Sequence, residues 1–463
     1  MTNLKMLFLV FGLWLAIPQT TQAQTANVSK QVEARTGHSL NPQTKSGGYA
    51  LPEGVLLDDG VTEDEAVAIA LWNNPALQAE MTAMGLARAD VIQAGLLTNP
   101  QLTMIFPFSF RILEAVANWP IEVIWQRPRR VAAAKLEQER IGETLVTRAL
   151  DLVRDVRLAY AEYAAAQTRS GIAEEIRRER SEIAVIVNAR LRAGDIGEME
   201  TSASITEARL AEERAARFTQ DAALAKERLR SLLGFENDAH APNFIAPQLQ
   251  LAPAASQIIS VQASMAPDVT SSSTIESEPL NKLITQAIEA RPELKAGELA
   301  IEAAGARAKW ERSRIIAVTA IAKEYGRGAN GFEQGPGLLI DLPIFNRNQG
   351  NISRAEAEIE RAAKQLIAAR QRVVADVREA YIQLTQAREA HQLWRARVLP
   401  PLERDIRLAE TAFRSGDVAY LFVLETARRY SDERLREADY QAATRRALAQ
   451  LERSVGRRLI ANR

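Results

Sequence analysis

The sequence of 463 residues contains no cysteine and only three histidines, and these gaps exclude several kinds of chemistry. Without cysteine the chain can form no disulfide, no thiolate nucleophile and no zinc–thiolate site, and it lacks the acylated cysteine of bacterial lipoproteins. His38, His240 and His391 have no further ligands at metal-binding spacing, so we expect all three to be surface residues. The sequence therefore predicts no metal site and no cofactor.

An excess of charge of one sign is also missing, because 58 basic residues balance 58 acidic ones. Nucleic-acid binding needs a basic excess to neutralise phosphates, so we expect no nucleic-acid partner. The stretch from Gly326 to Gly331 formally matches a dinucleotide-binding pattern, but a strand rather than a helix is expected after it, which favours a hairpin loop. Nucleophile elbows, P-loops and HExxH motifs are absent, and the sequence does not predict an enzyme.

Long apolar runs are confined to the N-terminus. Lys5 precedes an apolar core from Met6 to Ile17, and small residues follow before Gln24. This pattern predicts a secretory signal peptide over residues 1–23, with a membrane anchor or a buried helix as the alternative. The run is too short to span a bilayer, and no later stretch reaches eighteen apolar residues. We expect an exported protein with an N-terminal leader over residues 24–61.

Sequence duplication is the strongest positive signal. The sequence DVRLAY at Asp155 returns as DVREAY at Asp376, and LRAGD around Gly194 returns as FRSGD around Gly416. Self-similarity at this distance indicates a duplicated structural unit. We predict two structural repeats at residues 62–234 and 280–456, a linker or equatorial segment at residues 235–279, and a C-terminal tail at residues 457–463.

Each repeat contains a very long helical pattern that turns back on itself. Tracts almost free of proline lead to the two LRAGD-like turns, where a glycine can take the left-handed conformation that caps a helix. We predict long helical hairpins over residues 129–233 and 351–455. Hairpins of this length cannot bury their apolar stripes alone, so partner helices from the other repeat or from other subunits are required.

Before each hairpin the apolar period changes from helical to alternating, which predicts strands. We place them at residues 102–111, 118–127, 314–325 and 337–345. Trp119 and Trp125 would share one face of the second strand, roughly 20 Å apart. This spacing is typical of an apolar band edged by aromatic residues in a membrane. The alternative is a soluble sandwich with both tryptophans in its core.

Two carboxylates follow the predicted turns on the return helices. Glu200 lies six residues after Gly194, and Glu425 lies nine residues after Gly416. If several copies surround an axis, these side chains would form acidic rings that favour cations and set an aperture. The alternative is that both are ordinary surface glutamates.

These parts together resemble the TolC family of outer-membrane efflux ducts, from about Thr62 to Gly456. The resemblance implies a mainly α fold with a membrane β-barrel contribution: duplicated helix–strand–strand–long hairpin units, assembled as a homotrimer into a twelve-stranded β-barrel on a periplasmic α-barrel. The likeness is carried by Asn74-Pro75-Ala76-Leu77 with Arg291-Pro292-Glu293-Leu294, by GLLTNPQL (95–102), by LPIFNRNQGNISRAEAE (342–358), and by the turns LRAGD and FRSGD.

The resemblance also implies partners and sites. The hairpin turns would meet a periplasmic adaptor, also called a membrane fusion protein, which joins the duct to an inner-membrane pump of the RND type, while the strands would contact outer-membrane lipid. The tip residues are Arg192, Gly194, Asp195, Arg414, Gly416 and Asp417. The places of the family's two gate aspartates hold Phe422 and Glu425 here, so one charge per subunit is lost.

The likeness favours the heavy-metal branch that serves cobalt-zinc-cadmium or copper-silver pumps. It is carried most by ALWNNPALQAE and AGLLTNPQL, in the first repeat. Two alternatives stay open: a drug-efflux or type I secretion duct of the same fold, and a periplasmic coiled-coil adaptor or scaffold. An adaptor should have one hairpin between β-rich segments, whereas this sequence predicts two hairpins.

Overall fold

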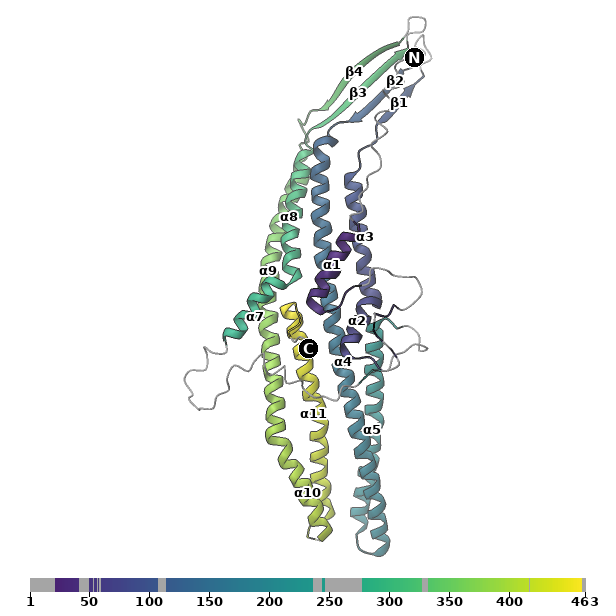
Figure 1. The fold of residues 1–463 in the computed structure, drawn as a ribbon, viewed down its shortest axis with the longest axis vertical. Helices are drawn as coiled ribbons and strands as arrows, with labels where there is room; N and C mark the ends of the chain where they lie inside the picture. The colour runs from purple at the N-terminus through teal and green to yellow at the C-terminus, as the bar shows by residue number, and fades with distance from the viewer. Residues whose placement is uncertain are drawn as a thin grey trace.

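The computed structural model describes residues 21–40, 50–52, 54–55, 57, 60–106, 114–235, 244–245, 277–326, 332–415 and 417–459. The molecule is long and narrow, with four strands at one end and two helical hairpins that reach the other (Figure 1). Helix α1 (Thr21–Thr36) precedes the first repeat, whose elements are α2 (Glu63–Asn73), α3 (Pro75–Gly95), β1 (Gln101–Ile105), β2 (Glu114–Pro120), α4 (Val123–Ala193) and α5 (Glu198–Leu233).

The second repeat has the same order of elements, which confirms the predicted duplication of helix, two strands and helical hairpin. Helix α4, at 71 residues, is about 105 Å long, and its counterpart in the second repeat is interrupted by the short π-helix η3. The elements are α7 (Ser277–Ala290), α8 (Pro292–Ser313), β3 (Ala317–Gly326), β4 (Phe332–Asp341), α9 (Gln349–Leu393), η3 (Trp394–Val398), α10 (Leu399–Ser415) and α11 (Tyr420–Val455).

Local sequence sets where several helices begin. Thr62 and Glu65 form the predicted capping box: the Thr62 hydroxyl accepts from the Glu65 backbone amide, and the Glu65 carboxylate accepts from the Thr62 amide at 2.8 Å. Helix α3 begins with Pro75 in its first turn, where a missing N–H costs nothing, and the Asn74 side chain accepts from the Leu77 amide. These caps fix the break between α2 and α3.

The four strands form one antiparallel sheet in the order β1-β2-β3-β4. The central pair, β2 with β3, joins the two repeats, and Trp119 lies opposite Ala320 in that register. Apolar side chains on both faces of the sheet are exposed, including Leu338 at 64% and Leu339 at 53%. Strands β1 and β4 are the edges of this sheet, so their outer backbone groups lack partners within the described chain.

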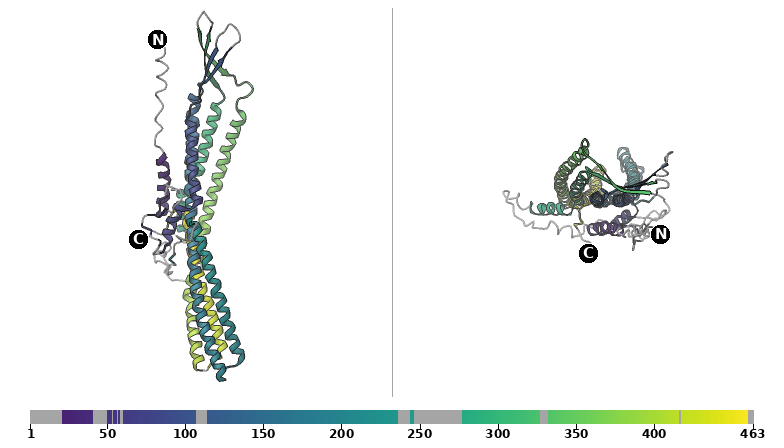
Figure 2. Two further views of the ribbon diagram at one scale, coloured as in Figure 1. Left: turned by 90° about the vertical axis from the view of Figure 1, so that its right-hand side faces the viewer. Right: turned by 90° about the horizontal axis from the view of Figure 1, so that it is seen from above.

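The long helices stand side by side as a wall. In the half toward the hairpin ends the order of packing is α9 continued by α10, then α11, α4 and α5, and toward the sheet it is α9, α8, α4 and α3 (Figures 1 and 2). The largest hydrophobic cluster lies where α2 packs against α4 and the end of α5, and it includes Ile69, Tyr160 and Leu229. None of the described helices combines the length and the apolar character needed to cross a bilayer.

Several predicted boundaries are wrong. The second strand was expected over residues 118–127, but β2 ends at Pro120 and Trp125 lies in α4. Pro120 cannot donate to the ladder, and the amides of Ile121 and Glu122 instead turn the chain by donating to the Val318 carbonyl. The hairpin therefore begins at Val123 rather than at residue 129, and the two tryptophans do not share a strand face.

Other predictions are corrected in part or fall outside the described residues. The predicted leader contains helix α1, which packs against α4. The fourth strand runs over 332–341 rather than 337–345, and β1 is described only to Ile105 because residues 107–113 lie outside the described chain. The signal peptide, apart from residues 21–23, and most of the linker lie outside it as well, as does His240.

His391 is not a surface residue, contrary to the prediction. Its side chain is 4% exposed, and its ring stacks on Tyr440 at a centroid distance of 6.5 Å. Burial lowers the pKa of His391 below its ordinary value. The sequence did not indicate this burial because α11, which covers this part of α9, is about fifty residues away along the chain.

Ion pairs of buried arginines connect the two repeats near the end of α11. Arg453 on α11 places Nε 2.7 Å from Asp151 Oδ1 on α4 and Nη2 2.5 Å from Glu293 Oε1 on α8. Arg291 donates to the same Glu293 oxygen at 2.9 Å. Arg157 and Glu452, each 8% exposed, form a further pair between α4 and α11. Partners on different helices let these charges remain buried.

The carboxylate of Glu293 should make folding stability depend on pH. Burial alone would raise its pKa, but the hydrogen bond from Arg291 and the charge of Arg453 outweigh burial and lower the pKa to about 2 from 4.5. The ionised group therefore stabilises the fold above pH 4.5, and this contribution is lost as the pH falls toward 2. The difference corresponds to roughly 3 kcal/mol.

We predict that Glu293→Gln destabilises the protein near pH 7 and that the gap to the wild type narrows as the pH falls from 4.5 toward 2. Thermal unfolding midpoints across this pH range measure the gap. A gap that stays constant would show that Glu293 contributes no stability through its ionisation.

Candidate gate and docking site at the hairpin ends

The turn of the first hairpin has the geometry predicted from its glycine. Gly194 has φ of +80° and ends α4, and its amide donates to the Leu191 carbonyl at 3.0 Å. The next amide, of Asp195, donates to the Arg190 carbonyl at 3.0 Å. These bonds satisfy carbonyls at the end of α4 and turn the chain toward α5. Arg192 and Asp195 are both exposed at this turn.

The second turn is built differently in its details. The Asp417 amide donates to the Ala412 carbonyl at 2.9 Å, and the Ser415 hydroxyl donates to Asp417 Oδ2 at 2.6 Å. Gly416 lies outside the described residues, and Arg414 belongs to α10. Asp417 is exposed, as expected for a residue at a tip.

A small hydrophobic cluster holds the two hairpin ends together. Val187 of α4 and Leu424 of α11 are 2% and 4% exposed, and Ile183, Ile196 and Phe413 pack around them. The Arg190 guanidinium lies 5.1 Å from the centroid of the Phe413 ring. Apolar contact thus fixes the distance between the two turns.

The predicted gate residues lie beside this cluster but do not meet one another within the chain. Phe422 on α11 is 58% exposed, and the Glu425 carboxylate pairs with Arg429 of the same helix at 3.2 Å. Glu200 lies in the first turn of α5 and is half-buried. Their roles in a gate stay predictions, because the aperture they would form requires other subunits.

The structure adds an open groove that the sequence did not indicate. It lies between the first turns of α5 and α11 and has a cavity volume of about 670 Å³. Glu198 and Met199 line it on α5, and Leu421 lines it on α11. Arg428 of α11 and Glu207 of α5 close it, with Nε and Oε1 3.6 Å apart. Helical periodicity places Glu207 on the same face of α5 as Met199 and Ala203, but only packing brings Arg428 to it.

A series of ion pairs continues from the groove along the seam between the hairpins. Each pair joins α11 to α4 or α5, and none could be assigned from sequence because the partners are more than two hundred residues apart. Arg214–Asp432 (3.4 Å), Arg434–Glu175 (2.9 Å), Arg169–Asp439 (2.5 Å) and Arg446–Glu162 (3.1 Å) follow in order.

Other proteins share sequence and architecture with this chain. A family model described as outer membrane efflux protein matches residues 283–457. The cobalt-zinc-cadmium resistance protein CzcC of Cupriavidus metallidurans is 25% identical over 402 residues, which are 86% of this chain and 90% of that protein. The pyoverdine export outer membrane protein OpmQ of Pseudomonas putida is 27% identical over 177 residues, 36% of this chain and 37% of that protein.

A solved structure of CusC has the same fold. Its TM-score to this chain is 0.67 at 19% identity, over 90% of this chain and 98% of that one. The family that matches the second repeat is a family of transport channels and not of enzymes. The chain is similar to the outer membrane efflux proteins over its second repeat and to CzcC over most of its length, which supports a location in the outer membrane with a large periplasmic portion. The TolC-family resemblance is confirmed.

Proposed function

We propose that the protein is the exit duct of a tripartite efflux system and that it passes divalent heavy-metal cations to the exterior. Members of this family form trimeric channels that work with a periplasmic adaptor and an inner-membrane pump. The single observation that carries the proposal is the helical wall with two open edges, which one chain cannot close.

The open edges support a homotrimer. Helix α9 exposes Ile367 at 61% and Ile382 at 52% on one edge, while α3 exposes Leu86 at 70% and α5 exposes Leu224 at 59% on the other. Apolar side chains in such numbers on long helices call for partner helices. Edge strands β1 and β4 likewise need partners. Three copies joined edge to edge would place twelve strands in one closed sheet above one tubular helical wall.

The cargo is inferred from relatives. The similarity to the cobalt-zinc-cadmium resistance protein extends over most of both chains, whereas the similarity to the pyoverdine exporter covers about a third of each. A duct need not coordinate what it passes, so the few histidines and the missing cysteines do not argue against metal cargo. We therefore favour cobalt, zinc and cadmium ions, with a siderophore or drug as the second candidate.

The hairpin ends would serve as the docking and gating region. The exposed turns at Gly194 and Asp417 are the parts of the helical wall farthest from the sheet (Figure 1), where a periplasmic adaptor would reach them. Glu200 and Glu425, repeated around a threefold axis, would present acidic side chains to a passing cation. Phe422 would narrow the same opening.

Cargo and docking can be tested together in the native host. We predict that deleting the gene lowers tolerance to zinc, cobalt and cadmium ions, measured as minimal inhibitory concentrations, and that Gly194→Val lowers tolerance almost as far. Valine is strained at φ of +80°, but a Cβ at Gly194 meets nothing within 4 Å, so trimers should form normally.

The matched control is Gly171→Val, which lies within α4, where a Cβ also meets nothing within 4 Å and φ is helical. It should leave tolerance unchanged. Unaltered metal tolerance in the deletion strain, together with siderophore trapped in the periplasm, would replace the metal proposal with the siderophore one. Full metal tolerance in the Gly194→Val strain would show that this turn is not part of the docking site.

A further inference from the structure

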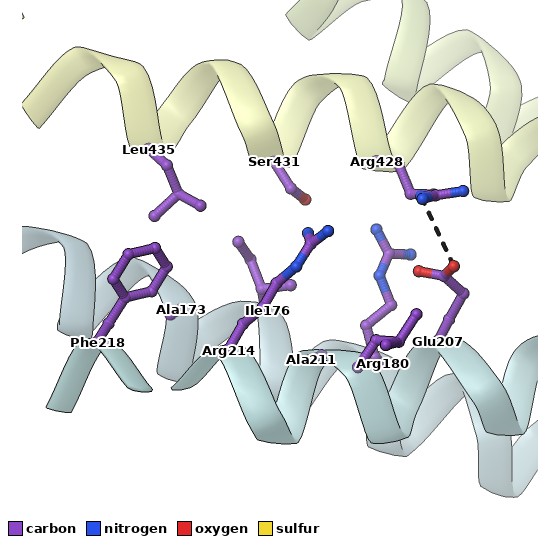
Figure 3. Close-up of a pocket in the computed structure, with 11 residues that line it drawn as sticks. Ala173, Ile176, Arg180, Glu207, Ala211, Arg214, Phe218, Arg428, Ser431 and Leu435 are labelled. Atoms are coloured by element: carbon purple, nitrogen blue, oxygen red, sulfur yellow. Dashed lines mark ion pairs between the residues drawn. The ribbon is translucent and has the colours of Figure 1, made fainter. Parts of the chain in front are cut away.

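The seam between the hairpins contains a small cavity whose charges do not balance. Figure 3 shows that it is roofed by α11 and floored by α4 and α5, and that the guanidiniums of Arg180 and Arg214 rise into the space below α11. Phe218, Ile176 and Leu435 provide apolar walls. Arg428 and the Ser431 hydroxyl complete the polar lining.

Two of the three arginines at this cavity have acidic partners. Arg428 pairs with Glu207 at 3.6 Å, and Arg214 pairs with Asp432 at 3.4 Å. Arg180 is different, because among the described residues none gives it a hydrogen bond or an ion pair, although its side chain is only 5% exposed. Three positive and two negative charges leave one uncompensated positive charge, on a side chain that is almost fully buried.

An unpaired buried charge is costly unless something compensates it. We propose that the cavity binds one small monovalent anion, of the halide class and typified by chloride, between Arg180, Arg214 and the Ser431 hydroxyl. One negative charge balances the three arginines against the two carboxylates. A bound anion would also clamp α4 and α5 to α11, since each of the three helices contributes a donor.

The size of the cavity argues for a small ion. The volume open to the centre of a water molecule is about 20 Å³, a little more than a single water needs. A monatomic anion fits this space, whereas a phosphate with four oxygens would force Phe218 or Leu435 aside. The site should therefore discriminate by size as well as by charge.

The test uses the purified full-length protein in detergent at constant ionic strength. We expect sodium chloride and sodium bromide to raise the thermal unfolding midpoint by about 2 °C relative to sodium gluconate, in a saturable way. Sodium phosphate should behave like gluconate. Crystals grown with bromide should show an anomalous peak between the guanidiniums of Arg180 and Arg214.

Arg180→Gln should abolish the difference between chloride and gluconate and should raise the midpoint in gluconate, because the uncompensated charge is gone. Arg178→Gln is the matched control: Arg178 is on the same helix, its side chain is 64% exposed, and it pairs with Glu174 across one turn. This control should keep the chloride response.

The proposal is overturned if the wild type unfolds at the same temperature in chloride and gluconate, or if Arg180→Gln keeps the chloride response. It is also overturned if the bromide crystals show no peak at the cavity. That last measurement needs no variant, so it decides the matter even if Arg180→Gln fails to fold.

Discussion

Replacing Gly234 with alanine is expected to destabilise the protein by about 3 kcal/mol and to sharply reduce the yield of folded trimer. Gly234 ends α5 with φ of +79°, and a Cβ there would overlap the carbonyl oxygen of Asn73 at the end of α2. The Asn74 side chain donates to the Leu232 carbonyl at 2.9 Å, so the two helix ends are already fixed against each other. The backbone cannot move aside cheaply.

Gly194→Ala is the matched control for this prediction. The two glycines have nearly equal φ angles, but a Cβ at Gly194 meets nothing within 4 Å. Gly194→Ala is expected to lower the stability by about 1 kcal/mol, because only the cost of placing an alanine in the left-handed conformation applies there. Thermal unfolding midpoints of the purified variants give the comparison. Equal losses of stability at both positions would show that the overlap with the Asn73 carbonyl does not contribute.

Replacing Arg453 with methionine is expected to cost about 2–3 kcal/mol, because it removes two charge-assisted hydrogen bonds that a buried cation makes to two partly buried carboxylates. Arg453 is 8% exposed and contacts both Asp151 and Glu293, so one side chain joins α11 to α4 and α8. The expected result is a lower thermal midpoint and looser association of the repeats, seen as faster amide hydrogen exchange in α11.

Two further variants separate charge from packing. Arg436→Met, on an exposed part of the same helix where the arginine pairs with Glu433 at 2.6 Å, should cost no more than about 0.5 kcal/mol. Glu293→Gln should cost less in the Arg453→Met background than in the wild type, since the ion pair between the two side chains is already lost, although the pair of Glu293 with Arg291 remains. A double variant whose loss of stability equals the sum of the two single losses would contradict the electrostatic explanation.

Much of the helical architecture could be predicted because it depends on neighbours in sequence. The capping box at Thr62 and Glu65 uses residues three positions apart, and the turn at Gly194 needs only a residue that tolerates positive φ. Duplication could be recognised from short matching segments at corresponding places. These signals do not require knowledge of what packs against them.

The errors arose where distant contacts decide the outcome. Residues 121–127 alternate like a strand, yet Val318 of the other repeat accepts the amides of Ile121 and Glu122 and ends the strand there. His391 looks polar and solitary in the sequence, yet in the fold its ring stacks on Tyr440 of α11, which also packs against Trp394. Neither partner could be chosen from local periodicity.

The candidate site likewise contains residues that the sequence predicted and residues that only the structure reveals. Sequence pointed to the turns and to Glu200, Phe422 and Glu425, and the structure puts all of them at one end of the molecule. It did not point to Arg180, Glu207 or Arg428, because long arginine- and glutamate-rich helices offer many equivalent pairings. Only the packing of α11 on α4 and α5 selects which of them meet.

The sequence by itself determined the twofold repeat, the two capped hairpins and the alternating segments between them, since each depends on bonds within a few residues. The tertiary structure alone decided where β2 ends, which charges are buried along the seam, and that Arg180 has no acidic partner within the described part of the chain. The physical reason is that these features depend on contacts between residues roughly 200 to 300 positions apart, whose pairing is set by the packing of the whole wall.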